Sequence, residues 1–384
     1  MPDVRLEYLN KILESDNPKK IIISGPGTGK TYTFKKLFEK IGDGNFLALT
    51  FIRKLSNSLQ DDLPAAVNAD TFHAFCKGIM HHVQGKVDIF PQLSDVILKD
   101  AEVLDPSLKS FDKKFQLLEE DGEEINFYLR RGDYYEYLSF NDSVYRLYKE
   151  LIRNPGVLPA YSQIVIDEYQ DFNPPEVAFI NELEKKGPIL IVGDDDQAVY
   201  SNKHSSPEYI REKYNSGEYE VHELPYCSRC PNVIINATNE FVANIVDVGG
   251  LSDRIEKRFL PFLSDDNPIN LRYSQIEYAE VPVLATLTNY IKHKVSCIPE
   301  DEIDESFDEN YPTALIIGQS QYITQLYKKL EPDIENIEIK VSDQNHYNIT
   351  DGMAILLNSE NNNLGWRILI EFLLPPLELT DVIN

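Results

Sequence analysis

The stretch that decides the fold of this chain is Ile21-Ile22-Ile23-Ser24-Gly25-Pro26-Gly27-Thr28-Gly29-Lys30-Thr31. Its apolar residues predict a buried strand, and its glycines allow a tight bend in which several N–H groups point at one anion. Apolar residues then recur at Phe34, Leu37, Phe38 and Ile41, a spacing that predicts a helix whose positive end faces the same anion. The stretch therefore predicts a phosphate-binding loop between a strand and a helix.

Two side chains at the end of this loop fit a nucleotide bound together with a metal ion. The ammonium of Lys30 can reach the β- and γ-phosphates, and the hydroxyl of Thr31 can ligate Mg²⁺. The strict motif has glycine where Ser24 stands, so this loop is the variant with a small residue at its first position. A glycine-rich turn without phosphate is the alternative. We expect the nucleotide to be held by Ser24, Gly25, Pro26, Gly27, Thr28, Gly29, Lys30 and Thr31.

Length and composition narrow the class of protein. The chain has 384 residues, more than one typical domain, so we expect two or three domains. A formal net charge of -26 argues against binding of any polyanion through the overall charge, so a nucleic-acid site would have to be local.

We expect a cytoplasmic chain with no membrane partner, because the sequence lacks a disulfide pattern, a long apolar run and a signal-peptide pattern. Packing is favoured over a metal site for the Cys227-x-x-Cys230 pair, which has no second pair nearby.

Two later apolar runs end in polar residues that suit phosphate chemistry. The run at 164–166 precedes Asp167 and Glu168, and the run at 189–192 precedes an acidic segment that ends in Gln197. Short runs of this kind are typical of central parallel strands, whose carboxyl ends collect ligands. We expect Asp167 to hold Mg²⁺, Glu168 to orient or deprotonate the attacking water, and Gln197 to sense the γ-phosphate. Alone, such ends are more often helix caps, but downstream of a phosphate loop they favour a nucleoside triphosphatase.

Taken together, these segments resemble the UvrD/Rep type of superfamily 1 DNA helicases. The resemblance rests on the order and spacing of residues 25–31, 48–51, 71–75, 167–171 and 193–200. Leu224-Pro225-Tyr226-Cys227-Ser228-Arg229 resembles the family's next motif, whose arginine reaches the γ-phosphate from the far side of the cleft. The resemblance implies an α/β fold of the P-loop NTPase type, with a RecA-like parallel sheet, an inserted helical subdomain and a partial second RecA-like domain.

The resemblance also implies an activity. It suggests a motor that uses ATP and Mg²⁺ to move from 3′ to 5′ along single-stranded DNA and to separate duplexes, in DNA repair or recombination. Hydrolysis would be carried by Lys30, Thr31, Asp167, Glu168, Gln197 and Arg229. Single-stranded DNA or a DNA junction would contact Thr50, Phe51, Arg53, Thr71, Phe72, His73 and Tyr200. Core packing is the alternative for Phe51 and Phe72, because aromatic residues at strand ends are often buried.

The sequence departs from the family pattern in three places. No glutamine precedes Gln60, although the family usually reads adenine with one upstream of the phosphate loop. Residues 201–204 replace an aromatic, an arginine and a glycine, and residues 366–384 contain nothing like the family's late motifs. The alternative function is therefore a truncated or degenerate relative that binds nucleotide or DNA without unwinding. A protein partner or a missing C-terminal half would then complete the motor.

These placements predict how the chain is organised. We expect the first RecA-like domain in residues 1–75 and 160–225, its inserted helical subdomain in 76–159, a partial second RecA-like domain in 226–345, and the start of a further subdomain in 346–384. Within them we expect a strand at 313–318 and an acidic, solvated loop at 300–310. The tyrosines at 134, 135 and 137 are expected as core and rim of a helical unit, with base stacking as the alternative.

Overall fold

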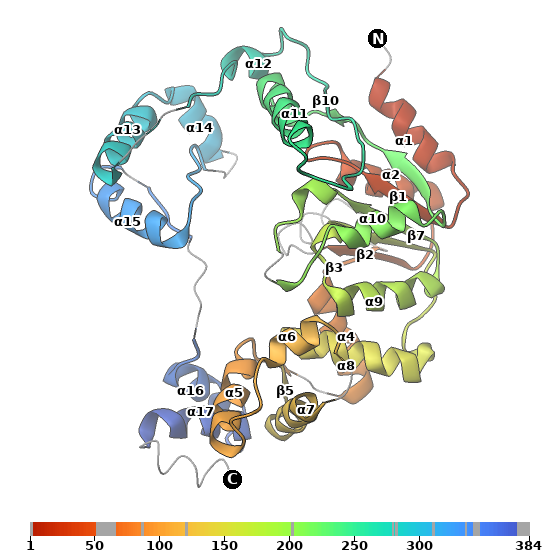
Figure 1. The fold of residues 1–384 in the computed structure, drawn as a ribbon, viewed down its shortest axis with the longest axis vertical. Helices are drawn as coiled ribbons and strands as arrows, with labels where there is room; N and C mark the ends of the chain where they lie inside the picture. The colour runs from red at the N-terminus through yellow and green to blue at the C-terminus, as the bar shows by residue number, and fades with distance from the viewer. Residues whose placement is uncertain are drawn as a thin grey trace. The chain divides into compact units, whose positions relative to one another are not determined.

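The computed structural model places most of the chain in helices and one sheet. The structure describes residues 3–50, 67–85, 88–119, 122–200, 203–278, 280, 283–308, 312–334, 336–340 and 346–374. Contacts divide the chain into two compact units, Met1–Gln275 with Tyr347–Asn384, and Ile276–His346. Figure 1 shows the elements of both units by label.

A parallel sheet forms the centre of the first unit. Among the described residues it contains six strands in the order β3-β2-β6-β7-β1-β8, and every neighbouring pair is parallel. This confirms the predicted α/β fold with a RecA-like parallel sheet. The strands are β1 (Lys19–Ile23), β2 (Phe46–Thr50), β3 (Val67–Thr71), β6 (Gln163–Ile166), β7 (Ile189–Gly193) and β8 (Glu220–Glu223).

Helices cover both faces of this sheet because the central strands are apolar on both faces. Ile22 of β1 packs into one core with α1 (Val4–Glu14) and α2 (Lys30–Ile41). Its neighbours Ile21 and Ile23 point to the other face, as the alternation of a strand requires. That second core includes residues from α4 (Phe72–Gln84), α8 (Phe140–Arg153), α9 (Pro174–Leu183) and α10 (Glu208–Asn215).

A smaller helical body lies between β3 and β6 in the chain. Its elements are α4, β4 (Asp88–Ile89), α5 (Leu93–Leu104), α6 (Phe111–Gln116), α7 (Glu123–Tyr135), β5 (Tyr137–Leu138) and α8. Its core contains the ring of Tyr135, whereas Tyr134 is 56% exposed, an arrangement that favours core and rim over base stacking for this tyrosine cluster. The predicted boundaries of the RecA-like domain and of this inserted subdomain stay predictions.

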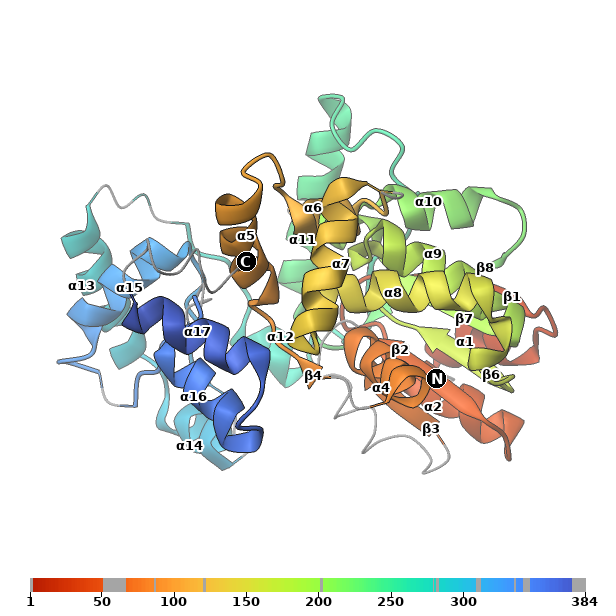
Figure 2. The ribbon, with the colours of Figure 1, turned by 90° about the horizontal axis from the view of Figure 1, so that it is seen from below.

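The C-terminal helices pack against this helical body. The hairpin of α16 (Ile349–Asn358) and α17 (Asn363–Leu373) adds Ile355, Leu364 and Ile368 to the same apolar core (Figure 2). A buried carboxylate ties the two parts together: Nε of Arg367 donates to Asp100 at 2.7 Å, and Arg131 and the hydroxyl of Tyr135 also contact Asp100. The sequence alone did not indicate the contact between Arg367 and Asp100, because these residues lie 267 positions apart.

Residues 226–275 belong to the same compact unit as the sheet, although the sequence assigned them to a second domain. They contain β9 (Tyr226–Cys227), α11 (Asn232–Asp247), β10 (Leu260–Pro261) and α12 (Pro268–Arg272), and β10 pairs with β9 in parallel. The second unit contains α13 (Leu284–Ser296), α14 (Glu300–Asp308) and α15 (Ser320–Leu330). The assignment of this region to a second RecA-like domain stays a prediction.

Two local expectations for this second unit are wrong. The acidic stretch predicted as a loop begins α14, because glutamates form helices well and acids in the first turn suit the helix dipole. The stretch predicted as a strand at 313–318 is irregular, with Leu315 73% and Ile317 85% exposed. A strand is stable only beside a hydrogen-bonded neighbour, and the described residues of this unit contain no strand.

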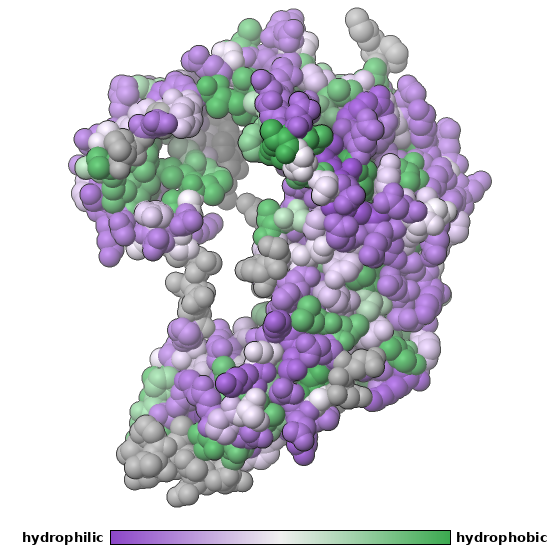
Figure 3. Space-filling model, in the orientation of Figure 1, coloured by the Kyte–Doolittle hydropathy of each residue, from purple (hydrophilic) through white to green (hydrophobic). Residues whose placement is uncertain are grey.

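Hydrophilic side chains cover most of the face shown in Figure 3, in keeping with the excess of acidic residues. Among the described residues, no helix has the length and apolar character needed to cross a membrane.

We predict that Arg367→Met destabilises the chain by about 2–4 kcal/mol, because Asp100 is fully buried and would lose one of its charged partners. Urea denaturation should show the loss. Lys11→Met is the control, since its pair with Glu7 is exposed and screened by solvent, so its loss should barely move the urea midpoint. Equal midpoints for the two variants would contradict a structural role for the buried pair.

Candidate active site

The candidate site lies where three neighbouring strands of the sheet end. Strands β6, β7 and β1 are adjacent and parallel, so the residues that follow them meet at one edge. The chain after β1 is fastened to the end of β7, because the backbone N–H of Ser24 donates to Gly193 at 3.1 Å. The phosphate loop, the acidic pair after β6 and the acidic run after β7 therefore come together.

The loop after β1 has the backbone shape that an anion site needs. Gly27 and Gly29 have φ of +69° and +92°, in the left-handed region that favours glycine. Gly29 precedes α2 as its N-cap and offers no capping side chain, so the first N–H groups of the helix remain for a ligand. The hydroxyl of Ser24 is buried and has no hydrogen-bond partner among the described residues, as expected of a polar group that awaits a ligand.

A chain of side-chain contacts joins the three strand ends. Nζ of Lys30 lies 2.9 Å from Oε1 of Glu168, and Nε2 of Gln170 donates to the other oxygen of Glu168 at 3.0 Å. Oε1 of Gln170 accepts from the backbone N–H of Asp194 at 3.1 Å. Glu168 itself has φ of +54°, in the left-handed region that is uncommon for residues other than glycine.

Burial and charge set the protonation of this edge. Burial raises the pKa of Asp167 to about 7, with Lys30 lowering and Glu168 raising it. Burial lowers the pKa of Lys30, but the carboxylates of Asp167, Glu168 and Asp194 raise it by more. Lys30 is therefore charged near neutral pH, whereas Asp167 needs a cation beside it to ionise fully. A buried carboxylate and the hydroxyl of Thr31 are hard oxygen donors, which fit Mg²⁺.

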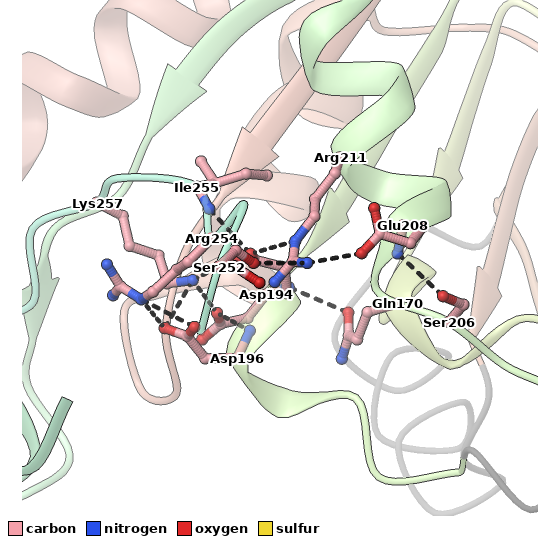
Figure 4. Close-up of polar contacts among 11 residues, drawn as sticks. Gln170, Asp194, Asp196, Ser206, Glu208, Arg211, Ser252, Arg254, Ile255 and Lys257 are labelled. Carbon is pink, nitrogen blue, oxygen red and sulfur yellow. Dashed lines mark hydrogen bonds and ion pairs between the residues drawn. The ribbon is translucent and has the colours of Figure 1, made fainter. Parts of the chain in front are cut away.

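The run after β7 forms an acidic triplet, Asp194, Asp195 and Asp196. Their carboxylate oxygens lie within 4.8 Å of one another, and they are the group of potential metal ligands found among the described residues. The ammonium of Lys257 contacts all three and offsets part of their negative charge. Figure 4 shows Lys257 beside Asp194 and Asp196. Oδ2 of Asp194 also accepts from Nε2 of Gln197 at 2.6 Å.

The segment that carries Arg229 lies directly on the phosphate loop. The backbone N–H of Ser228 donates to the carbonyl of Gly27 at 3.1 Å, and a Cβ built on Gly27 would be 2.6 Å from Cβ of Arg229. The structure thus places the backbone of Arg229 beside the loop. Cys227 is buried and Cys230 is partly buried, both as free thiols, and neither belongs to a metal-binding group among the described residues.

The residues expected to contact DNA are placed unequally. Phe51 and Arg53 lie outside the described residues. Thr50 and Phe72 are fully buried, and the ring of Phe72 packs on Phe172 and Phe179. This burial favours the core-packing alternative for Phe72, because the helix that begins with it packs on the sheet, and it places Thr50 inside the sheet. Contact of either residue with DNA stays a prediction.

Three expected DNA contacts remain partly accessible, namely Thr71, His73 and Tyr200. The hydroxyl of Thr71 caps α4 by accepting from the N–H of Ala74. His73 lies 3.5 Å from Glu176, and burial together with Lys203 lowers the pKa of His73 to about 4. His73 is therefore neutral at pH 7, so it would meet a phosphate by hydrogen bonding and not as a cation.

Sequence reasoning missed two contributors to this site. Gln170 lay inside a recognised motif, but its link between two strand ends depends on the turn that η2 (Tyr169–Asp171) makes. Lys257 belongs to a short basic stretch, with Arg254 and Arg258, in a chain of strong acidic excess. That local charge contrast was the available indication.

A parallel sheet with an open glycine-rich loop, a lysine at the helix start and acidic ends on the adjacent strands defines a P-loop nucleoside triphosphatase. A family profile described as "AAA domain" matches residues 10–203, half of the chain. The chain belongs to this family and, within it, to the UvrD/Rep-type superfamily 1 helicases.

Named relatives agree with this assignment. DNA helicase II of Haemophilus influenzae is 23% identical over 327 residues, which cover 71% of this chain and 44% of that protein. ATP-dependent DNA helicase Rep of Buchnera aphidicola is 23% identical over 218 residues, 54% of this chain and 30% of that protein. DNA helicase II of Escherichia coli is 28% identical over 140 residues, 35% of this chain and 19% of that protein. The chain thus spans less than half the length of these relatives.

We predict that Gly27→Ala weakens nucleotide binding by at least about tenfold, which is a loss of about 1.4 kcal/mol or more in binding free energy. A side chain here strains the backbone and displaces loop groups that must approach the phosphates closely. The φ of +69° and the contact with Arg229 both oppose a methyl group there. Gly78→Ala is the matched control, because no atom lies within 4 Å of its Cβ position. Calorimetric titration with ATP and Mg²⁺ measures both, and equal affinities would contradict the placement of the loop.

We predict that Glu176→Gln reduces the loss of stability with rising pH. Burial raises the pKa of Glu176 to about 7, so its stabilising protonated form is present at low pH and is lost as pH rises through 7. Relative to wild type, the variant should therefore gain about 1–3 kcal/mol between pH 5.5 and 8.5. Denaturation at both pH values measures this, with the more exposed Glu182→Gln on the same helix as control. A gain in the control alone would contradict the prediction.

Proposed function

We propose that this chain is the ATP-hydrolysing part of a DNA helicase, which couples ATP turnover to 3′ to 5′ movement on single-stranded DNA. The observation that carries the proposal is the continuous contact path from Lys30 through Glu168 and Gln170 to Asp194 and Gln197. It connects the group that binds phosphate to the groups that act on it. The DNA substrate and the helicase activity in this proposal are taken from the names of the relatives.

Each residue of the site has a proposed role in hydrolysis. Lys30 and the N–H groups of the loop hold the phosphates, and Thr31 and Asp167 hold Mg²⁺, which offsets charge on the phosphates when bound. Phosphate oxygens compete with Glu168 for the ammonium of Lys30, so nucleotide binding frees Glu168 to orient or deprotonate the attacking water. Gln197 senses the γ-phosphate. Arg229 adds a further positive charge beside the phosphates, from the segment that contacts Gly27.

The proposed DNA path crosses the first domain near Thr71, His73 and Tyr200. The ammonium of Lys203 lies 5.5 Å from the ring centre of Tyr200, which places a positive charge and an aromatic face together. Such pairs bind single strands without reading their sequence. The proposal also includes the unwinding of duplexes or junctions. It further includes a role in DNA repair or recombination and a cytoplasmic location. The remaining part of the motor would come from further chain or from a protein partner.

One observation favours the second candidate, an accessory module that binds nucleotide or DNA without unwinding. The stretch at 313–318 resembles a strand of the second motor domain, yet it is irregular and exposes Leu315 and Ile317. A motor whose second lobe is unformed cannot close on ATP. The intact hydrolytic residues oppose this candidate, so we retain the ATPase as the main proposal.

We predict that the chain hydrolyses ATP with Mg²⁺ and that single-stranded DNA raises the rate. Glu168→Gln should lower kcat by about 10²–10⁴-fold, the usual contribution of a general base, and should leave ATP binding in place. Lys30→Ala should lose ATP binding. Steady-state hydrolysis with and without DNA, together with calorimetric ATP binding, measures all three properties.

The control for these variants is Lys36→Ala, an exposed lysine on the same helix whose partner is Glu39. It should match the wild type in both assays. A wild-type chain that binds ATP but does not turn it over with or without DNA would favour the accessory module. Unchanged hydrolysis in Lys30→Ala would mean that the loop is not the site.

A further inference from the structure

The acidic triplet after β7 brings three carboxylates together, and of the cations that pair with it, Lys257 is the one that contacts all three. Three carboxylates lie within 4.8 Å of one another beside the phosphate loop. Nζ of Lys257 lies 2.6 Å from Asp194 and 2.8 Å from Asp196, and it also contacts Asp195. The Lys257 side chain is only 7% exposed, so solvent screens these contacts little. Burial lowers the pKa of Lys257, but the three carboxylates raise it by more, which keeps the ammonium charged.

The carboxylate of Asp194 connects this lysine to the proposed γ-phosphate sensor. Oδ1 of Asp194 contacts Lys257 and accepts from the backbone N–H of Asp196 at 3.1 Å. Oδ2 accepts from the side-chain amide of Gln197 at 2.6 Å. The orientation of one carboxylate therefore fixes the Gln197 amide. Without Lys257, repulsion within the triplet would turn Asp194 away from this orientation.

The other two carboxylates anchor the segment that carries Lys257. Asp195 accepts from Nε of Arg211 at 2.9 Å and from the backbone N–H of Ile255 at 3.0 Å. Asp196 accepts from Nε of Arg254 at 2.9 Å (Figure 4). The contacts of Arg254 and Ile255 hold the chain just before Lys257 against the triplet, and this directs the Lys257 ammonium toward its carboxylates.

The same segment also reaches the other parts of the site. Two residues after Lys257, the ring of Phe259 lies 3.0 Å from the Cβ position of Gly25 in the phosphate loop. The next residues form β10, which pairs with β9 just before Arg229. Residues 254–261 thus touch the acidic triplet, the phosphate loop and the strand that leads to the arginine.

We propose that Lys257 is a positioning residue for ATP hydrolysis, which clamps the acidic triplet and thereby holds Gln197 where it meets the γ-phosphate. The inference rests on the proposed function, because it gives Lys257 a role only through a working Gln197. A structural cation is the competing explanation for three clustered carboxylates. The ammonium of Lys257 already sits among their oxygens and takes the place that such a cation would occupy.

The test is a double-mutant cycle on kcat of the full chain with ATP and Mg²⁺, using Lys257→Met, Gln197→Ala and the double variant. Lys257→Met should lower kcat by about 2- to 150-fold, the range that coupling between residues of one hydrogen-bond network spans. In the Gln197→Ala background the same substitution should leave kcat nearly unchanged. Any effect on the KM for ATP through lost positive charge should appear in both backgrounds.

The matched control is Lys213→Met, which removes another largely buried lysine that pairs with Glu184 and does not touch the triplet. It should lower stability without lowering kcat. A kcat loss for Lys257→Met that multiplies with that of Gln197→Ala would overturn the inference, as would a wild-type kcat in Lys257→Met. If Gln197→Ala itself keeps the wild-type kcat, the sensor role in the proposed function fails and the inference falls with it.

A second readout does not need turnover, so it separates failure of the inference from failure of the proposed function. The backbone N–H groups of Asp196 and Gln197 both donate to Asp194, and their exchange with deuterium reports on the clamp in the nucleotide-free chain. Exchange there should be faster in Lys257→Met than in Lys213→Met. Equal exchange in the two variants would overturn the clamp even if the chain hydrolyses no ATP.

Discussion

The parallel alignment of β6, β7 and β1 is the constraint on which the rest of this structure depends. Parallel neighbours end at the same edge of a sheet, so the three segments that carry phosphate chemistry meet there. The pairing of Ile23 with Gly193 sets the register, and the hydrogen bond from Ser24 to Gly193 extends it into the loop. A slip of one residue would turn the side chains of β1 to the opposite faces and separate these groups.

The site that results has a lysine facing carboxylates on each of its two sides. Lys30 pairs with Glu168 on one side, and Lys257 pairs with the acidic triplet on the other. Gln170 joins the two, because its amide contacts Glu168 with one end and the backbone of Asp194 with the other. A nucleotide that takes Lys30 from Glu168 therefore disturbs one end of a connected path. This connection gives a physical route by which phosphate binding reaches Gln197.

The sequence predicts the parts of this molecule that depend on short segments with strong local rules. The phosphate loop at 21–31 and the acidic strand ends follow from apolar periodicity, glycine and charge, and the α/β fold follows from the family resemblance that these segments carry. Local sequence patterns do not predict contacts between distant segments, so neither Lys257 beside the triplet nor Arg367 beside Asp100 was expected. Burial of Phe72 depends on how its helix packs, and the irregular chain at 313–318 depends on which strands are present to pair with it. Both are tertiary effects that local propensity does not contain.

The measurement that tests this account most directly is a crystal structure of the chain with Mg²⁺ and a non-hydrolysable ATP analogue. We expect the phosphates in the loop at 24–31, Lys30 moved from Glu168 to the phosphate oxygens, and Gln197 still held by Asp194 and facing the γ-phosphate. A bound analogue with its phosphates elsewhere, or with Lys30 still paired to Glu168, would contradict the account.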